Sequence, residues 1–275
     1  MIRIRTLVVL AIVLGALMAA IGCVTSPTGR TQVLLNSEYE MAEMGRVAFV
    51  DIQSNTPKST NADQIGYVRC VANAITATLT SGELRPIAVD RWEVELFEDP
   101  TANASALPGG NLGVHTGRLA VATTPAQLAT VLGHEVGHVV SRHGNERVTQ
   151  QMIAAGGVEA LQIVLGGDSP EKKKLYGAIG AGAAQFGFLL PFGRAQESEA
   201  DEFGLELMAR AGFDPRESVS LWRNMARASG GRAPIEFMST HPSYTTRIRR
   251  LEQGLPRAIL IYDRTVSAGN RMHCR

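Results

Sequence analysis

The residues best suited to do chemistry lie in the segment His134-Glu135-Val136-Gly137-His138. If this segment is helical, the two histidines project from one face, one turn apart, and can bind a single Zn²⁺ at about 2.0–2.1 Å each. Glu135 then lies about 100° further round the helix, where it can act on a water as a general base without being a ligand. With 6 histidines in 275 residues, chance produces this arrangement in roughly one comparable chain in a hundred. The segment therefore predicts a site for one zinc ion per chain.

A catalytic zinc needs three protein ligands and one open position for water. The candidate for the third ligand is Glu197, and Asp201, one helical turn later, would accept an imidazole N–H and fix the tautomer of a ligand. The alternative is an acidic, solvated first turn that complements a helix dipole. We expect that alternative to describe the neighbouring Glu199 and Glu202.

Hydrophobic periodicity indicates the elements that must position these side chains. Helices are predicted over about 36–53, 61–80, 125–143, 147–165, 171–189, 194–211, 215–229 and 243–253. Alternation over 92–97 and two short pieces within 103–115 predict strands, and the apolar run 258–262 is either a strand or part of the tail. The fold class is therefore mainly α with a small β-sheet (α+β), and the helix at 125–143 carries the histidine pair.

The paired histidines, together with Glu197-x-x-x-Asp201, resemble the gluzincin-like zinc metallopeptidases of the HtpX and Ste type. Within that family the chain looks most similar to the periplasmic BepA-like and LoiP-like lipoprotein metalloproteases, over about residues 36–253. The resemblance implies a zincin-like fold and a zinc-dependent endopeptidase. It also implies substrates that are misfolded or stalled proteins of the bacterial envelope, including the outer membrane.

The resemblance extends to an edge segment at 103–110, which precedes the zinc-binding helix. The strand that follows, Asn111, Leu112, Gly113 and Val114, is the candidate edge to which an extended substrate would pair through main-chain hydrogen bonds. The alternative is an ordinary strand of the core.

A second segment, Thr240-His241-Pro242-Ser243 with Arg247, resembles the C-terminal signature of the family. By that resemblance His241 lies near the metal, where it would stabilise the oxyanion or occupy the open coordination position in a resting state. Arg247 would polarise the substrate carbonyl or clamp Glu197.

The N-terminus reads as a targeting segment. Arg3 and Arg5 precede the apolar stretch 7–20, which is typical of a signal peptide over residues 1–22. Cys23 follows a small residue, as in a bacterial lipobox, so we expect lipidation there and a lipid-anchored tether over 23–35. Ala20 departs from that pattern, which leaves ordinary cleavage or an uncleaved anchor open. Val24 resembles a signal for outer-membrane sorting, and the expected location is the outer membrane, facing the periplasm.

Composition limits the remaining choices. With 27 basic and 26 acidic residues, the chain lacks the basic excess of a nucleic-acid binder.

If Cys23 is lipidated, Cys70 and Cys274 remain as a pair. A disulfide between them would tie the tail, 254–275, to an N-terminal helix. The alternative is a buried Cys70 and a free thiol at Cys274.

Residues 175–193 contain no charged side chain. They are expected to form a buried helix, a lid or a membrane segment.

The rival to an endopeptidase is a chaperone-like or regulatory lipoprotein. Its zinc site would be structural or self-inhibited, closed by His241 as a fourth ligand.

Overall fold

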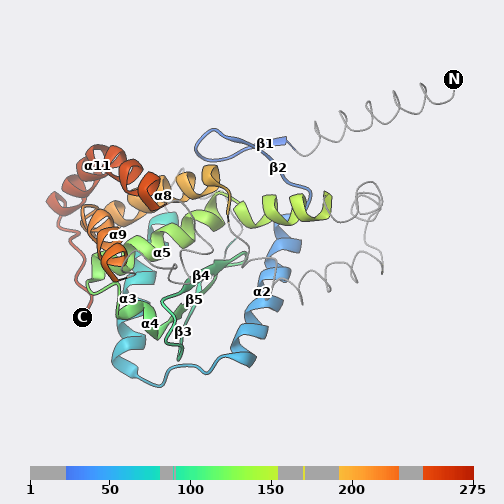
Figure 1. Cartoon of the computed structure of the whole chain (residues 1–275), viewed down its shortest axis with the longest axis horizontal. Helices are drawn as coiled ribbons and strands as arrows, with labels where there is room; N and C mark the ends of the chain where they lie inside the picture. Colours follow the sequence, from blue (N-terminus) through green and yellow to red (C-terminus); the bar gives the residue numbers. More distant parts are fainter. Residues whose placement is uncertain (1–22, 81–88, 90, 154–169, 171–191, 229–243) are drawn as a thin grey trace.

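The computed structural model describes residues 23–80, 89, 91–153, 170, 192–228 and 244–275. In this part of the chain, helices surround a three-stranded sheet, and a two-stranded hairpin packs beside them (Figure 1). The predicted α+β class is confirmed. The helices are α2 (Glu38–Asn55), α3 (Ala62–Ala77), α4 (Thr116–Leu119), α5 (Pro125–Val140), α8 (Arg194–Arg210), α9 (Glu217–Ala228) and α11 (Tyr244–Ser267), with a short 3-10 helix η1 (Thr78–Thr80) after α3.

Helix α5 runs through the core. Its first turn is set by the Thr124 side chain, which accepts a hydrogen bond from the Gln127 backbone N–H, and by Pro125 at the first position. Every residue from Gln127 to Val140 is buried, as expected for a helix that is packed on all sides. The helix ends at Val140, earlier than predicted, because Arg142 adopts a left-handed conformation with φ of 57°. A new helix then begins at His143 and is described to Ile153.

Helix α8 packs closely against α5, as the colour-coded ribbon also shows (Figure 1). Small residues permit this approach: a Cβ on Gly204 would lie 2.9 Å from the backbone nitrogen of His134, and one on Gly137 would lie 3.0 Å from the Ala200 oxygen. The two backbones are therefore near contact where α8 faces the histidine pair.

The larger sheet consists of β3 (Glu93–Phe97), β4 (Ala104–Leu107) and β5 (Asn111–His115), in the order β3-β5-β4. Its central strand, β5, pairs parallel with β3 and antiparallel with β4, so Leu112 has Val94 on one side and Ala106 on the other. The prediction that Asn111, Leu112, Gly113 and Val114 form a substrate edge is therefore wrong, because β5 is hydrogen-bonded to a strand on each side. In this sheet β4 is the edge strand that packs against α5.

The two faces of this sheet belong to different cores. Leu112 and Val114 face the main core, which is shared with α3, α5, α8 and α9. On the opposite face, Phe97 and Leu107 pack against Phe49 of α2. The alternation of β-strand side chains thus places the sheet between α2 and the helices of the metal site.

The C-terminal helix is longer than predicted. α11 continues to Ser267 and includes the run 258–262, so the expected strand or tail at that place is wrong. The reason is helical spacing: Leu251, Ala258 and Tyr262 are all buried in the main core. Beyond α11 the chain returns to α3, where Cys274 forms a disulfide with Cys70.

The segment 23–35, predicted to be a lipid-anchored tether, folds onto the domain over residues 23–33. Strands β1 (Cys23–Thr25) and β2 (Thr31–Val33) form an antiparallel hairpin, and Gly29 supplies the positive φ that its turn requires. Polar contacts fix the hairpin, because Arg30 forms ion pairs with Glu146 and with Glu199 of α8.

Within the described residues, no helix combines the length and the apolar character needed to cross a bilayer. The stretch 175–193 lies outside the described residues, except for Phe192 and Gly193.

Candidate metal centre

The structure brings together the three side chains predicted to bind metal. The two histidine Nε2 atoms lie 3.1 Å apart. Glu197 Oε2 lies 3.6 Å from His134 Nε2, and Glu197 Oε1 lies 3.5 Å from His138 Nε2. A tetrahedral zinc ion, with bonds of about 2.0–2.2 Å, holds its ligand atoms about 3.3 Å apart. Both the donor types and their spacing therefore fit zinc, and the cluster is buried.

Burial also favours the protonation state that binds metal. Burial, and next the positive charge of Arg247, lower the pKa of His134 to about 4. Burial likewise holds the pKa of His138 well below its usual value. Both imidazoles are therefore neutral at pH 7, as metal ligands must be.

On its outer side His134 contacts a carboxylate of α8. Its Nδ1 lies 3.0 Å from Asp201 Oδ1, the contact predicted to fix the tautomer of this ligand. Burial alone would raise the pKa of Asp201, but Arg247 and His134 keep it below its usual value. An ionised acceptor therefore lies behind His134.

Arg247 of α11 clamps the acidic side of the site. Its Nη1 donates to Glu197 Oε2 at 2.7 Å, and its Nε donates to Asp201 Oδ2 at 2.9 Å. Arg247 is 2% exposed, and its guanidinium carbon lies 4.1 Å from the centroid of the Trp222 ring. Burial alone would lower the pKa of Arg247. The carboxylates of Asp201 and Glu197 outweigh this effect, so its pKa lies above the usual value. Of the two predicted roles of Arg247, these contacts match the clamp on Glu197.

Glu135 is buried beside His134 on α5. Its carboxylate interacts electrostatically with Arg247 and with the fully buried Arg118. Burial lowers the pKa of Arg118 to about 9, and Glu135 opposes that shift. The predicted general base therefore interacts electrostatically with two guanidinium groups.

A contact on the other ligand escaped the sequence prediction. His143 Nδ1 lies 2.9 Å from His138 Nδ1, and His143 Nε2 lies 3.1 Å from Glu199 Oε2. The prediction of a solvated Glu199 is wrong, since this residue is 4% exposed. A helix that continued through residue 143, as predicted, would carry His143 on a different face from His138. The left-handed residue Arg142 ends that helix and redirects the chain. Glu202 is exposed, as predicted.

An aromatic ring covers the same ligand. Phe192, just before α8, stacks on His138 with ring centroids 3.8 Å apart and planes inclined by 24°. On its other face, Arg147 lies 4.2 Å from the Phe192 centroid. This stack was not predicted, because neither Phe192 nor Arg147 belongs to a recognisable metal-binding pattern.

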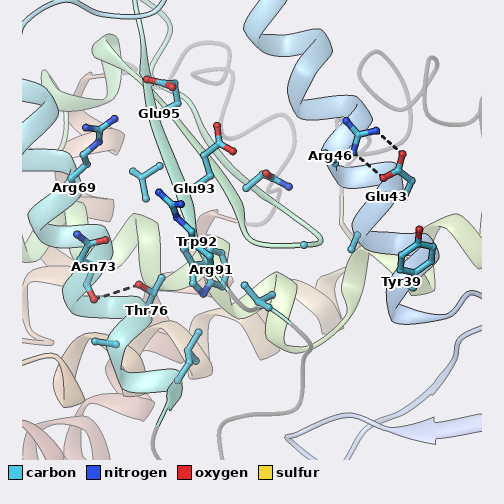
Figure 2. A pocket seen from close by; sticks show the side chains of 17 residues that line it. Tyr39, Glu43, Arg46, Arg69, Asn73, Thr76, Arg91, Trp92, Glu93 and Glu95 are labelled. Carbon is cyan, nitrogen blue, oxygen red and sulfur yellow. Dashed lines mark hydrogen bonds and ion pairs between the residues drawn. The ribbon is translucent and has the colours of Figure 1, made fainter.

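The predicted role of His241 near the metal falls outside the described residues. Asn111 lines a groove of about 1140 Å³ between α2, α3 and β3, whose wall includes the ion pair of Glu43 and Arg46 (Figure 2). None of the metal-site residues lines this groove, so the catalytic chemistry is not located there.

Comparison with known proteins supports this site at the level of the family. The model of "Peptidase family M48" matches residues 71–254. The mitochondrial metalloendopeptidase OMA1 of Schizosaccharomyces pombe is 39% identical over 194 residues, which cover 70% of this chain and 53% of that protein. OMA1 of Saccharomyces cerevisiae is 36% identical, over 64% of this chain and 50% of its own length. The chain thus spans about half the length of these relatives.

The beta-barrel assembly-enhancing protease of Escherichia coli is less similar, at 28% identity over 56% of this chain and 32% of its own length. The expected kinship to BepA-like and LoiP-like proteins is therefore correct for the family but not for the subgroup. The expected location, a lipid anchor in the bacterial outer membrane, is contradicted, because the more similar relatives are mitochondrial. The matched residues include both histidines, Glu135, Glu197 and Asp201, and the chain belongs to peptidase family M48.

Proposed function

We propose that this chain is a zinc-dependent endopeptidase that hydrolyses peptide bonds in unfolded or misfolded proteins. One observation carries the proposal: His134, His138 and Glu197 present their donor atoms 3.1–3.6 Å apart, from two packed helices. Among the described residues the cluster has three ligands. Three ligands leave a tetrahedral ion one position for water or substrate, as in a catalytic site, whereas a structural site is closed by four.

The chain's own residues divide the work. Zinc, when bound, would polarise the scissile carbonyl and make a water more acidic. Glu135, beside the first histidine on α5, takes the proton of the attacking water and passes it to the leaving amine nitrogen. Arg247 and Asp201 keep Glu197 and His134 in place, through hydrogen bonds of 2.7 and 3.0 Å.

The sheet supports the proposed substrate class. β4 is an edge strand and packs against α5, which carries the histidine pair. An extended peptide that pairs with such an edge is recognised through its main chain, with little dependence on its side chains. Polypeptide segments that have lost their fold can adopt this conformation, whereas folded domains cannot.

The test compares Glu135→Gln with the wild-type chain in a casein cleavage assay, with zinc content measured on both. We expect Glu135→Gln to retain about one zinc per chain and to lose cleavage by at least about 10²-fold, since it removes the general base. Glu252→Gln, an exposed residue of α11, is the matched control and should cleave like the wild type. Cleavage by Glu135→Gln at the wild-type rate would contradict the proposed mechanism.

A further inference from the structure

His143 is a buried histidine that the proposed hydrolysis does not use. Its ring has no exposed surface and lies between His138 and Glu199, with contacts of 2.9 and 3.1 Å at its two nitrogens. These contacts come from different elements, since His138 belongs to α5 and Glu199 to α8. The imidazole therefore connects a metal ligand to a carboxylate of a neighbouring helix.

The protons in this chain of contacts can be assigned from both ends. His138 turns Nε2 toward Glu197 and the other histidine, so its proton is on Nδ1 when Nε2 binds metal. That N–H needs an acceptor, and the facing atom is Nδ1 of His143. At the other end, ionised Glu199 can only accept, so Nε2 of His143 donates to it. Both ends require the same neutral tautomer of His143.

The carboxylate that receives this hydrogen bond is itself held. Thr28 donates to Glu199 Oε1 at 2.6 Å, and Arg30 Nε donates to Oε2 at 2.9 Å. The same guanidinium donates to both oxygens of Glu146, at 2.8 and 2.7 Å. Thr28 and Arg30 belong to the N-terminal hairpin, outside the region matched by the family model. The outer support of His138 therefore includes the segment 23–33.

We propose that His143 is a positioning residue for the zinc ligand His138, and that Glu199 and Arg30 hold it in that position. The inference rests on the proposed zinc site. Groups that hydrogen-bond to a metal-binding histidine orient the ring and raise its basicity, and their loss costs about 10–100-fold in metal affinity. The alternative is a histidine that only fills space. A neutral space-filling residue requires no buried carboxylate behind it, whereas this one has Glu199 with three donors.

The experiment measures the zinc dissociation constant of the full chain by competition with a chelating dye. We expect His143→Ala to weaken zinc binding by about 10–100-fold, and Arg30→Ala to weaken it by a smaller factor. His143→Asn places an amide oxygen near the position of Nδ1, so it should recover most of the affinity. Glu202→Gln, an exposed change on α8, is the matched control and should bind zinc like the wild type.

The unfolding temperature of each metal-free variant separates positioning from simple loss of stability. If His143→Ala and His143→Asn unfold at similar temperatures yet differ in zinc affinity, the hydrogen bond and not the volume is responsible. A dissociation constant for His143→Ala within twofold of the wild type would overturn the inference, while leaving the peptidase proposal intact. A wild-type chain that binds no zinc would overturn both.

Discussion

The two histidines of α5 are supported in different ways, although they lie one turn apart on the same helix. His134 contacts a carboxylate directly, and Arg247 neutralises that carboxylate from α11. His138 contacts the neutral ring of His143, which in turn contacts Glu199. The first support lies entirely within residues 71–254, whereas the second also uses the hairpin at 23–33. The comparison teaches that one ligand is held by residues within the matched region, whereas the other also depends on a segment outside it.

The largest effect is expected on the first support. Arg247→Leu would leave Glu197 and Asp201 buried without their cation, and breaking such a buried pair costs about 3–5 kcal/mol. We expect a matching fall in the free energy of unfolding, measured with urea, together with loss of zinc. Arg223→Leu breaks the exposed ion pair with Glu252 and should cost at most about 1 kcal/mol. Equal losses in the two variants would show that Arg247 is not the clamp.

Acid should weaken both supports in the metal-free chain. The folded-state pKa values of His134, His138 and His143 are all lowered, that of His134 to about 4, with burial the largest cause in each. Unfolded histidines take up protons near pH 6.5, so the free energy of unfolding falls as the pH drops from about 6.5 toward 4. Each group contributes up to about 1.4 kcal/mol per pH unit over this range.

Urea titrations at several pH values, repeated on His134→Gln and His138→Gln, test this expectation. Each variant removes one titrating group and should flatten the dependence on pH. A pH dependence that keeps its full slope in both variants would locate the acid sensitivity elsewhere in the molecule.

The first support can also be weakened while Arg247 stays in place. In Asp201→Asn the acceptor behind His134 becomes a neutral amide, and we expect zinc affinity to fall by about 10–100-fold. Comparison with His143→Ala by the same dye competition ranks the two supports. An unchanged affinity in Asp201→Asn would assign the orientation of His134 to Arg247 alone.

The smallest expected change affects both supports at once, because it moves α8. A Cβ in Gly204→Ala would meet the His134 backbone nitrogen at 2.9 Å, so the helices must separate, at a cost of about 1–3 kcal/mol. Gly66→Ala in α3, where a Cβ meets nothing within 4 Å, should instead stabilise the chain by about 0.5–1 kcal/mol. Thermal unfolding of the two variants should therefore shift in opposite directions, and shifts in the same direction would contradict the close packing of α5 and α8.

Much of the fold and the three-residue cluster could be predicted, because helical periodicity and a four-residue spacing are local properties of the sequence. Glu197 is far from His134 in the sequence. It was predicted to bind the same ion because a catalytic zinc requires a third protein ligand. The strand order was not predictable, since it depends on which strand pairs with which, and an edge position was therefore assigned to β5, which is the central strand. His143 and Glu199 were missed because a single left-handed residue, Arg142, changes the direction of the chain.

The disulfide between Cys70 and Cys274 has a consequence for the denatured protein. The two cysteines are 204 positions apart, and the metal-site residues from His134 to Arg247 all lie between them. An oxidised chain that unfolds thus remains closed between Cys70 and Cys274 and keeps its ligands tethered. The loop-closure entropy for a separation of this length corresponds to about 5 kcal/mol. A thiol reductant would open this loop, so the same polypeptide should tolerate heat and chaotropes far better in oxidising surroundings than in reducing ones.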